Sequence, residues 1–300
     1  MGIEKAKGSR GEFEGVYSLM LTPFDESGEI DWKTYEAYIE WQLSHKPNGL
    51  FAVCGSSEMA HLSLQERIVL AELAVKRAGH TPVVATANLE QGVEENKEEI
   101  KRIAEMGVSG IVLVPPAGMG EDQRKLGQYL AQLAEASPVP VLLYECPIWK
   151  PHLIDADIYS DLVNRHGVVG IKDTTCTMEG ILAKINGAPD GIVLQANTPL
   201  MLASLQQGAR GIMAITTTAV ADVALKLWKH ALDEDQTIAK EAHRQLIFLD
   251  SLLGMGYTAT AKYLVSLRGV PMSTRTRGGS AIQPTSAKAI EAWFEAFCGS

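Results

Sequence analysis

The sequence has 300 residues, 46% of them apolar and 21% charged, a balance that fits one large globular domain, or one with a helical appendage. Its formal net charge of −9, with no run rich in lysine and arginine, argues against nucleic acid or an anionic membrane as a partner. The charged start lacks a signal-peptide core and no apolar run reaches the ~18 residues that a membrane helix needs, so we expect a soluble, cytoplasmic protein.

Short apolar runs recur along the chain and predict buried β-strands. Most of them leave no polar face, which is typical of a parallel sheet covered by helices. The strand candidates are Val16–Leu21, Gly49–Val53, Pro82–Ala87, Gly110–Val114, Val139–Tyr144, Val168–Lys172, Ile192–Gln195 and Gly211–Ile215.

Segments of helical periodicity separate these runs. Ser63 followed by Glu66 is a capping-box pattern that predicts the start of the second helix. After residue 222 the strand pattern stops, and helices are expected over Ala224–Leu232, Thr237–Leu253, Thr258–Leu267 and Ser286–Phe297.

A weak internal repeat marks the loops that lead from helix to strand. Met106-Gly107-Val108-Ser109-Gly110-Ile111 recurs as Gln207-Gly208-Ala209-Arg210-Gly211-Ile212, and the segment from His166 to Ile171 is similar. The first glycine suits a left-handed helix end. Eight strand–helix units in about 230 residues favour an α/β fold of the (β/α)8 TIM-barrel type over an open sheet. We expect an N-terminal extension (1–13), a catalytic barrel (14–232) and a C-terminal helical appendage (233–300).

Two predicted strands end on residues that suit imine chemistry. The run Val168–Lys172 finishes on a lysine, and burial lowers the pKa of an ammonium, which makes the nucleophilic neutral amine available. Such an amine forms a Schiff base with a carbonyl substrate. The run before it ends on Tyr144, and strand alternation allows both side chains to point into the barrel. The alternatives are a lysine that reaches solvent and a tyrosine that only packs.

The segment after the second strand, Cys54-Gly55-Ser56-Ser57-Glu58, joins small hydroxyl residues and a glycine just before a helix. Its backbone N–H groups and hydroxyls predict a carboxylate-binding loop, although ordinary loop chemistry explains the same residues. Cys54, Cys146 and Cys176 all follow predicted strands, so a zinc-binding thiolate cluster is an alternative. Free cysteines that act as small buried hydrophobes are the preferred interpretation.

Together these segments resemble the dihydrodipicolinate synthase / N-acetylneuraminate lyase superfamily of Schiff-base aldolases. Met20-Leu21-Thr22-Pro23-Phe24-Asp25 is similar to the family's opening strand and turn, and Gly55-Ser56-Ser57-Glu58 lies where the family has its carboxylate loop. Leu143-Tyr144-Glu145-Cys146-Pro147 and Gly170-Ile171-Lys172-Asp173 are similar to its tyrosine and lysine strands. The resemblance covers about residues 14 to 270.

The resemblance implies an enzyme that joins its lysine to C2 of pyruvate or a longer 2-oxo acid. Carried onto this chain, Lys172 is the nucleophile, Tyr144 the proton shuttle, and Ser56 the hydroxyl that links the tyrosine to the proton relay. The expected substrate-binding set is Gly55, Ser57, Trp149, Thr174 and Met213. No metal or organic cofactor is expected, and the family implies a homo-oligomer, either a dimer or a tetramer.

Three features depart from the family's pattern. Ser57 and Cys54 replace glycines of the carboxylate loop. Trp149 stands where dihydrodipicolinate synthase itself has an arginine for the carboxylate of its aldehyde substrate, and an indole offers no bidentate fork. The segment Val114–Met119 lacks the tyrosine that many members lend to a neighbouring subunit. A Schiff-base lyase tolerates these changes more easily than the lysine-biosynthesis activity does.

Several functions remain open from the sequence. The leading hypothesis is a class I lyase that makes or breaks a carbon–carbon bond at a 2-oxo acid, or dehydrates a 2-keto-3-deoxy sugar acid through the same imine. A rim formed by Thr174, Thr175 and Thr216 to Thr218 would suit such a sugar acid, although threonine is common at strand ends. The alternatives are a non-catalytic relative that binds a 2-oxo acid as sensor or structural partner, and a cysteine-bound metal hydrolase.

Overall fold

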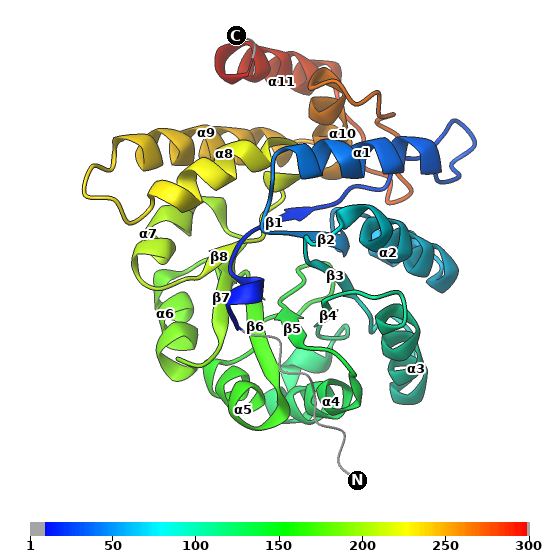
Figure 1. The fold of residues 1–300 in the computed structure, drawn as a ribbon, viewed down its shortest axis with the longest axis vertical. Helices are drawn as coiled ribbons and strands as arrows, with labels where there is room; N and C mark the ends of the chain where they lie inside the picture. The colour runs from blue at the N-terminus through cyan, green and yellow to red at the C-terminus, as the bar shows by residue number, and fades with distance from the viewer. Residues whose placement is uncertain (1–9, 299–300) are drawn as a thin grey trace.

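The computed structural model describes residues 10–298, in which eight parallel strands form a closed barrel surrounded by helices (Figure 1). The strands pair in sequence order, and β8 returns to β1 to close the sheet. The strands are β1 (Gly15–Leu19), β2 (Gly49–Val53), β3 (Val83–Thr86), β4 (Gly110–Leu113), β5 (Val141–Tyr144), β6 (Val168–Asp173), β7 (Ile192–Gln195) and β8 (Gly211–Ile212). The predicted (β/α)8 fold is therefore confirmed.

Eight helices follow the eight strands, and three further helices form the C-terminal region. The barrel helices are α1 (Trp32–Ser44), α2 (Leu64–Ala78), α3 (Val93–Ala104), α4 (Gln123–Ala136), α5 (Ala156–His166), α6 (Met178–Gly187), α7 (Met201–Gln206) and α8 (Thr217–His230). The C-terminal helices are α9 (Thr237–Leu253), α10 (Tyr257–Leu267) and α11 (Pro284–Phe297). Short 3-10 turns occur at Arg10–Phe13, Met59–His61, Met119–Glu121 and Thr198–Leu200.

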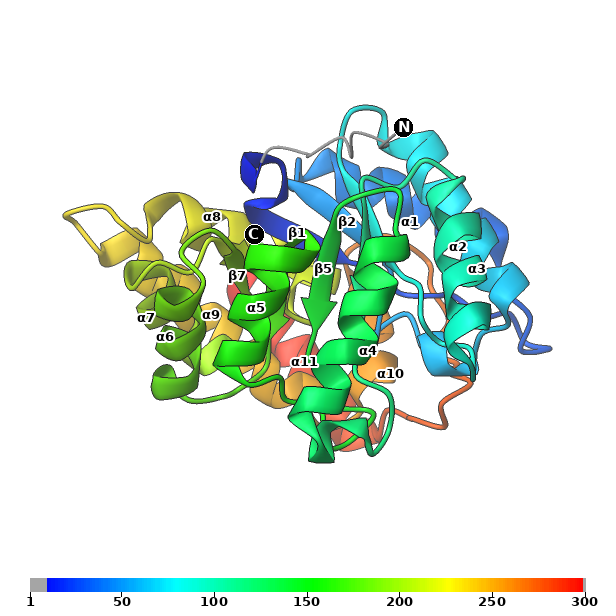
Figure 2. The same cartoon turned by 90° about the horizontal axis from the view of Figure 1, so that it is seen from below.

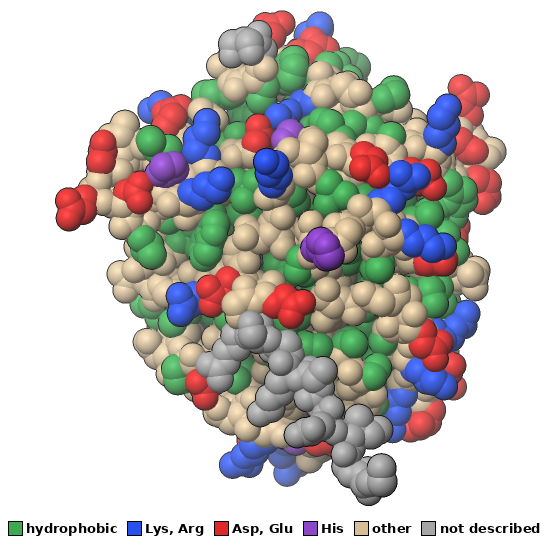
Figure 3. Space-filling model, viewed as in Figure 1, with side chains coloured by type: hydrophobic (Ala, Val, Ile, Leu, Met, Phe, Trp, Pro, Cys, Tyr) green, Lys and Arg blue, Asp and Glu red, His purple; other side chains and the backbone are tan. Residues whose placement is uncertain are grey.

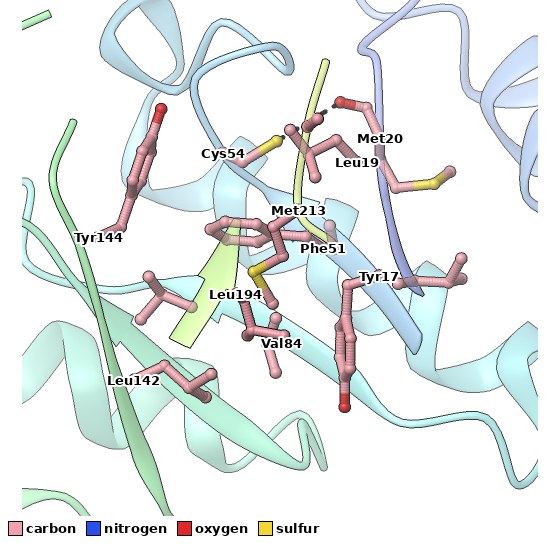
Figure 4. Packing of buried hydrophobic residues seen from close by; sticks show 14 of the residues in the cluster. Tyr17, Leu19, Met20, Phe51, Cys54, Val84, Leu142, Tyr144, Leu194 and Met213 are labelled. Atoms are coloured by element: carbon pink, nitrogen blue, oxygen red, sulfur yellow. Dashed lines mark hydrogen bonds between the residues drawn. The ribbon is translucent and has the colours of Figure 1, made fainter. Parts of the chain in front are cut away.

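The strands are buried on both faces, which explains their almost unbroken apolar composition. Every residue of β1 to β5 is buried. Tyr17, Val84, Leu142, Leu194 and Met213 pack together between the strands, as Figure 4 shows. The barrel interior is a packed core, so the polar residues at the strand ends stand out from it.

The loops have the backbone that their glycines predict. Gly107, Gly167 and Gly208 have φ angles of +88°, +74° and +106°, in the left-handed region that glycine adopts without a steric penalty. The capping box of α2 is also present: the Glu66 side chain accepts from the Ser63 N–H at 2.8 Å, and the Ser63 hydroxyl accepts from the Glu66 N–H. These details confirm the predicted alternation of helix and strand.

The eighth unit differs from the expectation, because β8 is shorter and its helix begins earlier. The strand ends at Ile212 instead of Ile215, and α8 starts at Thr217 instead of Ala224. The Thr217 hydroxyl donates to the Ala214 carbonyl at 2.7 Å and accepts from the Leu19 N–H at 3.0 Å. These bonds turn the chain into a helix where the apolar pattern alone predicts a longer strand.

The C-terminal helices lie against one side of the barrel (Figures 1 and 2). Helix α9 packs along α8, and α11 packs on α9 and α10. No helix among residues 10–298 is long and apolar enough to cross a membrane. On the face drawn in Figure 3 acidic and basic side chains are interspersed. Residues 1–9 of the predicted N-terminal extension lie outside the described residues.

Candidate active site at the barrel mouth

Lys172 and Tyr144 lie side by side at the carboxyl ends of neighbouring strands. They are register partners in the pairing of β5 with β6. The Lys172 ammonium lies 3.9 Å from the centroid of the Tyr144 ring and 5.6 Å from that of Phe51. Catalytic groups of such barrels come from these strand ends, so the geometry brings the two predicted residues together in the expected place.

The Lys172 side chain is a buried cation without a buried anion to balance it. The residue is 4% exposed, and no described carboxylate forms an ion pair with it. Lys184 and Lys262 are also buried, but each has a carboxylate oxygen 2.8 Å from its ammonium. Burial therefore lowers the pKa of Lys172 from 10.5 to about 8, against a smaller opposite effect of Cys54 and Cys146. About a tenth of its amine is therefore neutral at pH 7, far more than for an ordinary lysine.

The Tyr144 hydroxyl lies close to Gly55. A Cβ built on Gly55 would lie 3.1 Å from the Tyr144 oxygen. Burial, more than the neighbouring thiols, raises the pKa of Tyr144 well above its ordinary value. The phenol is thus protonated at neutral pH and available as a proton donor.

The predicted carboxylate-binding loop after β2 contains backbone donors that no described residue uses. The N–H groups of Gly55, Ser56 and Ser57 donate to no acceptor among residues 10–298. The Ser57 hydroxyl closes the turn, because it accepts from the Cys54 N–H at 2.6 Å and donates to the Cys54 carbonyl at 2.8 Å. Three consecutive free N–H groups make a concavity suited to a carboxylate.

The hydroxyl of Ser56 has a different neighbour from the one the resemblance implies. It donates to the Met20 carbonyl at 3.1 Å and lies 3.1 Å from the Cys54 sulfur. The side chain that would approach the Tyr144 phenol belongs to position 55, where this chain has glycine. The relay role of Ser56 therefore stays a prediction.

The C-terminal region holds the carboxylate loop through Glu58. Its carboxylate accepts from the Lys262 ammonium at 2.8 Å and from the N–H groups of Arg277 and Gly278 at 2.7 and 2.8 Å. Glu58 itself has a φ of +60°, which is costly for a residue with a side chain. The sequence pattern does not reveal Lys262, Arg277 and Gly278 as partners of Glu58, because Lys262 is 204 positions away from it.

A second buried ion cluster fixes the ends of β5 and β6 from outside the barrel. The Lys184 ammonium lies 2.8 Å from Glu145 and 2.7 Å from Asp173, the residues that directly follow Tyr144 and Lys172. Burial alone would lower the pKa of Lys184, but the two carboxylates raise it, so the lysine stays charged. Thr174 joins the same cluster by donating its hydroxyl to the Glu145 carbonyl and its N–H to the Glu145 carboxylate.

Substitution Lys184→Met is expected to destabilise the protein by about 3–5 kcal/mol, because it leaves two buried carboxylates without a cation. Thermal unfolding at neutral pH measures the effect. The matched control is Lys76→Met, since Lys76 pairs with Glu72 at the surface with 63% of its side chain exposed. That control should stay within about 1 kcal/mol of the parent. Equal melting temperatures for the two variants would contradict the structural role of the cluster.

The remaining predicted residues lie at different depths in the barrel. Met213 lies in the barrel interior close to Phe51 (Figure 4). Trp149 is half-buried and packs against the hydrophobic core. Cys176 is exposed, with a φ of +60°, and its sulfur lies 2.8 Å from the Asn197 amide. Within residues 10–298 no three His, Cys, Asp or Glu side chains are grouped so that they could hold a metal ion.

Comparison with known proteins agrees with this geometry. The sequence matches the dihydrodipicolinate synthetase family over residues 12–289. A 4-hydroxy-tetrahydrodipicolinate synthase from Agrobacterium fabrum is 26% identical over 285 residues, which span 93% of this chain and 97% of the relative.

Solved structures show the same fold. YagE, a prophage protein of E. coli K12 crystallised in complex with pyruvate, is 22% identical with a TM-score of 0.86, over 95% of this chain and 98% of its own. The dihydrodipicolinate synthase of Aquifex aeolicus is 23% identical with a TM-score of 0.87 over the same shares. Since the family match extends over most of the sequence, the chain belongs to the dihydrodipicolinate synthetase family.

Proposed function

We propose that this protein is a Schiff-base lyase that acts on pyruvate or a longer 2-oxo acid. The observation that carries the proposal is the buried, unpaired Lys172 beside the ring of Tyr144. A buried cation without a counter-ion costs stability, and an active site is where such a cost is retained. A non-catalytic binder has no physical need for it, which favours the enzyme over the sensor.

The reaction follows from the positions of these two side chains. The neutral Lys172 amine attacks C2 of the 2-oxo acid, and the protonated Tyr144 phenol donates to the departing hydroxyl, so that water leaves and an imine forms. The cationic imine then withdraws electrons from C3. Loss of a proton from C3, or cleavage of the bond between C3 and C4, gives an enamine that Lys172 stabilises.

The carboxylate of the 2-oxo acid is the group that the loop after β2 would bind. The free N–H groups of Gly55, Ser56 and Ser57 supply donors of the kind that bind anions. Ser56 also keeps its proposed part in proton transfer, with its hydroxyl near Met20. YagE, which shares the fold, binds pyruvate, and this supports the choice of ligand.

Two outcomes of the same imine are part of the proposal. Retro-aldol cleavage yields pyruvate and an aldehyde, whereas dehydration yields a 2-oxo acid that keeps the whole carbon chain and has lost one molecule of water, so product analysis separates them. The family resemblance supports a homo-oligomer, dimer or tetramer, in the cytoplasm. Gly55, Ser57, Trp149, Thr174 and Met213 remain the proposed substrate-binding residues.

The rate of imine trapping should depend on pH in a way that reports the amine. Below pH 8 the neutral fraction of the Lys172 amine falls about tenfold for each unit by which the pH is lowered, since its pKa is about 8. With pyruvate and cyanoborohydride we expect the trapping rate to rise with pH and to reach half its maximum near pH 8. Mass spectrometry of quenched samples measures the rate. A half-maximal trapping rate near pH 10.5, the ordinary lysine pKa, would contradict the lowered pKa of Lys172.

A further inference from the structure

We infer that the second substrate, the aldehyde that the enzyme takes up or releases, carries an uncharged apolar group in place of a carboxylate or a chain of hydroxyls. This inference rests on the proposed function and concerns the same pocket. Three features of the barrel mouth support it: its exposed apolar side chains, its occupied hydroxyls and its paired charges.

The space beside the Tyr144 hydroxyl has an apolar wall. Gly55 contributes no side chain there, and the Ile148 Cδ1 lies 3.7 Å from the point that a Cβ on Gly55 would occupy. The Tyr144 oxygen lies 3.1 Å from the same point, so Ile148 and the phenol face one small space. Ile148 is 49% exposed, so its side chain is accessible to a ligand in this space.

A second exposed side chain with apolar surface, that of Tyr257, comes from the C-terminal region. Tyr257, at the start of α10, is 45% exposed and has a φ of +42°. It is among the groups that raise the pKa of Tyr144, behind burial and Cys146. A group attached to the reacting aldehyde would meet the Ile148 side chain in the space beside the Tyr144 hydroxyl.

The threonine hydroxyls at the mouth are mostly occupied by the protein itself. Four of the five predicted rim threonines donate to oxygens at 2.7 Å: Thr174 to Glu145, Thr175 to Asp173, Thr217 to Ala214 and Thr218 to Ile215. Thr216 has a buried hydroxyl without a partner among the described residues. Among these threonines only the Thr216 hydroxyl is free to donate to a substrate alcohol, which disfavours a polyhydroxylated substrate.

The charged side chains that follow β2, β5 and β6 are also occupied. Glu145 and Asp173 share the Lys184 ammonium, and Glu58 is paired with Lys262. A second substrate carboxylate would have no compensating cation among them, and burial of an unpaired charge is costly.

Lys150 is an exposed lysine in the connection between β5 and α5. Burial is the main cause that lowers the pKa of His152, and the Lys150 charge is the next. The backbone of this lysine is fixed by a hydrogen bond from the Gly118 N–H to its carbonyl.

The aldehyde is joined to the enamine of the 2-oxo acid by an aldol addition. C3 of the enamine forms a bond to the aldehyde carbon while the carbonyl electron pair moves to oxygen. The proton that left C3 when the enamine formed is delivered to that oxygen through Tyr144. Water then hydrolyses the imine, which restores the Lys172 amine and releases a 4-hydroxy-2-oxo acid. No oxidant or other co-reactant is required.

The experiment compares aldehydes in condensation with pyruvate by the purified full-length protein. The panel contains 3-methylbutanal and benzaldehyde as apolar members, glyceraldehyde as the hydroxylated member and succinic semialdehyde as the anionic member. We expect kcat/KM for the better apolar aldehyde to exceed that for each of the other two classes at least about tenfold. Preference for glyceraldehyde or succinic semialdehyde, or turnover of no aldehyde, would overturn the inference.

Variants test whether Ile148 sets the preference. Ile148→Arg should lower kcat/KM for the apolar aldehydes and raise it about tenfold for succinic semialdehyde, because it adds the missing cation. The matched control is Leu153→Arg, since Leu153 is 39% exposed in the same connection between β5 and α5. That control should keep the parent's preference, and an equal switch in both variants would contradict the role of Ile148.

Imine trapping with pyruvate alone separates the two levels of the account. An adduct on Lys172 together with a preference for a hydroxylated or anionic aldehyde would support the Schiff-base lyase and contradict only the apolar second substrate. Absence of any adduct would remove both.

Discussion

Substitution Lys172→Met is expected to lower turnover at least about 10⁴-fold while it raises the stability of the protein. The activity falls because no other group at the mouth can form the imine, and loss of a covalent nucleophile has effects of this order. Methionine has a similar volume and no charge, so the buried position stays filled. Steady-state assays of pyruvate release or consumption measure the loss.

The stability of the same variant provides an independent readout. In the folded state the pKa of Lys172 is lowered to about 8, so the folded protein holds this proton less tightly than the unfolded chain does. Below pH 8 the penalty is fully present and amounts to roughly 3 kcal/mol. It shrinks between pH 8 and the ordinary lysine pKa of 10.5. The variant should therefore melt at a higher temperature than the parent at pH 7, and this difference should decrease as the pH rises. A variant that is less stable at pH 7 would contradict the unpaired buried charge.

Substitution Tyr144→Phe should reduce kcat by about 10² to 10⁴-fold with a small change in KM for pyruvate. The ring beside the Lys172 ammonium is kept, and only the hydroxyl that supplies protons is lost. The imine should still form, more slowly, so trapping with a reductant continues over a longer time. Mass spectrometry of samples quenched at successive times measures the rate of imine formation, and initial-rate assays measure kcat.

A second buried tyrosine serves as the control for that variant. The Tyr159 hydroxyl donates to the Ile192 carbonyl at 3.0 Å, away from the barrel mouth. Tyr159→Phe should cost about 1 kcal/mol of stability and leave kcat within a few-fold of the parent. If Tyr144→Phe behaved like Tyr159→Phe, Tyr144 would have no part in proton transfer.

The fold and the central pair of residues could be predicted from the sequence because they depend on local patterns. The apolar runs that end on Tyr144 and Lys172 reveal buried parallel strands, and the barrel then brings their ends together. The left-handed backbone at Gly107 and Gly208, the glycines of the repeat, could likewise be predicted from the local sequence alone.

Other features of the site depend on contacts between distant segments, which periodicity does not reveal. The Glu58–Lys262 pair joins a loop of the barrel to a C-terminal helix, and Lys184 faces the strand ends from α6. The position of Gly55 below the Tyr144 phenol depends on the exact turn of the carboxylate loop. The family resemblance implies Ser56 as the hydroxyl linked to that phenol, whereas in the structure the Ser56 hydroxyl donates to the Met20 carbonyl.

The most direct test of the Schiff-base assignment is to reduce the protein with borohydride in the presence of pyruvate and to map the modified peptide. We expect one reduced pyruvyl group, located on Lys172 and missing from the folded Lys172→Met variant. An adduct on a different lysine, or no adduct in folded parent protein, would contradict it.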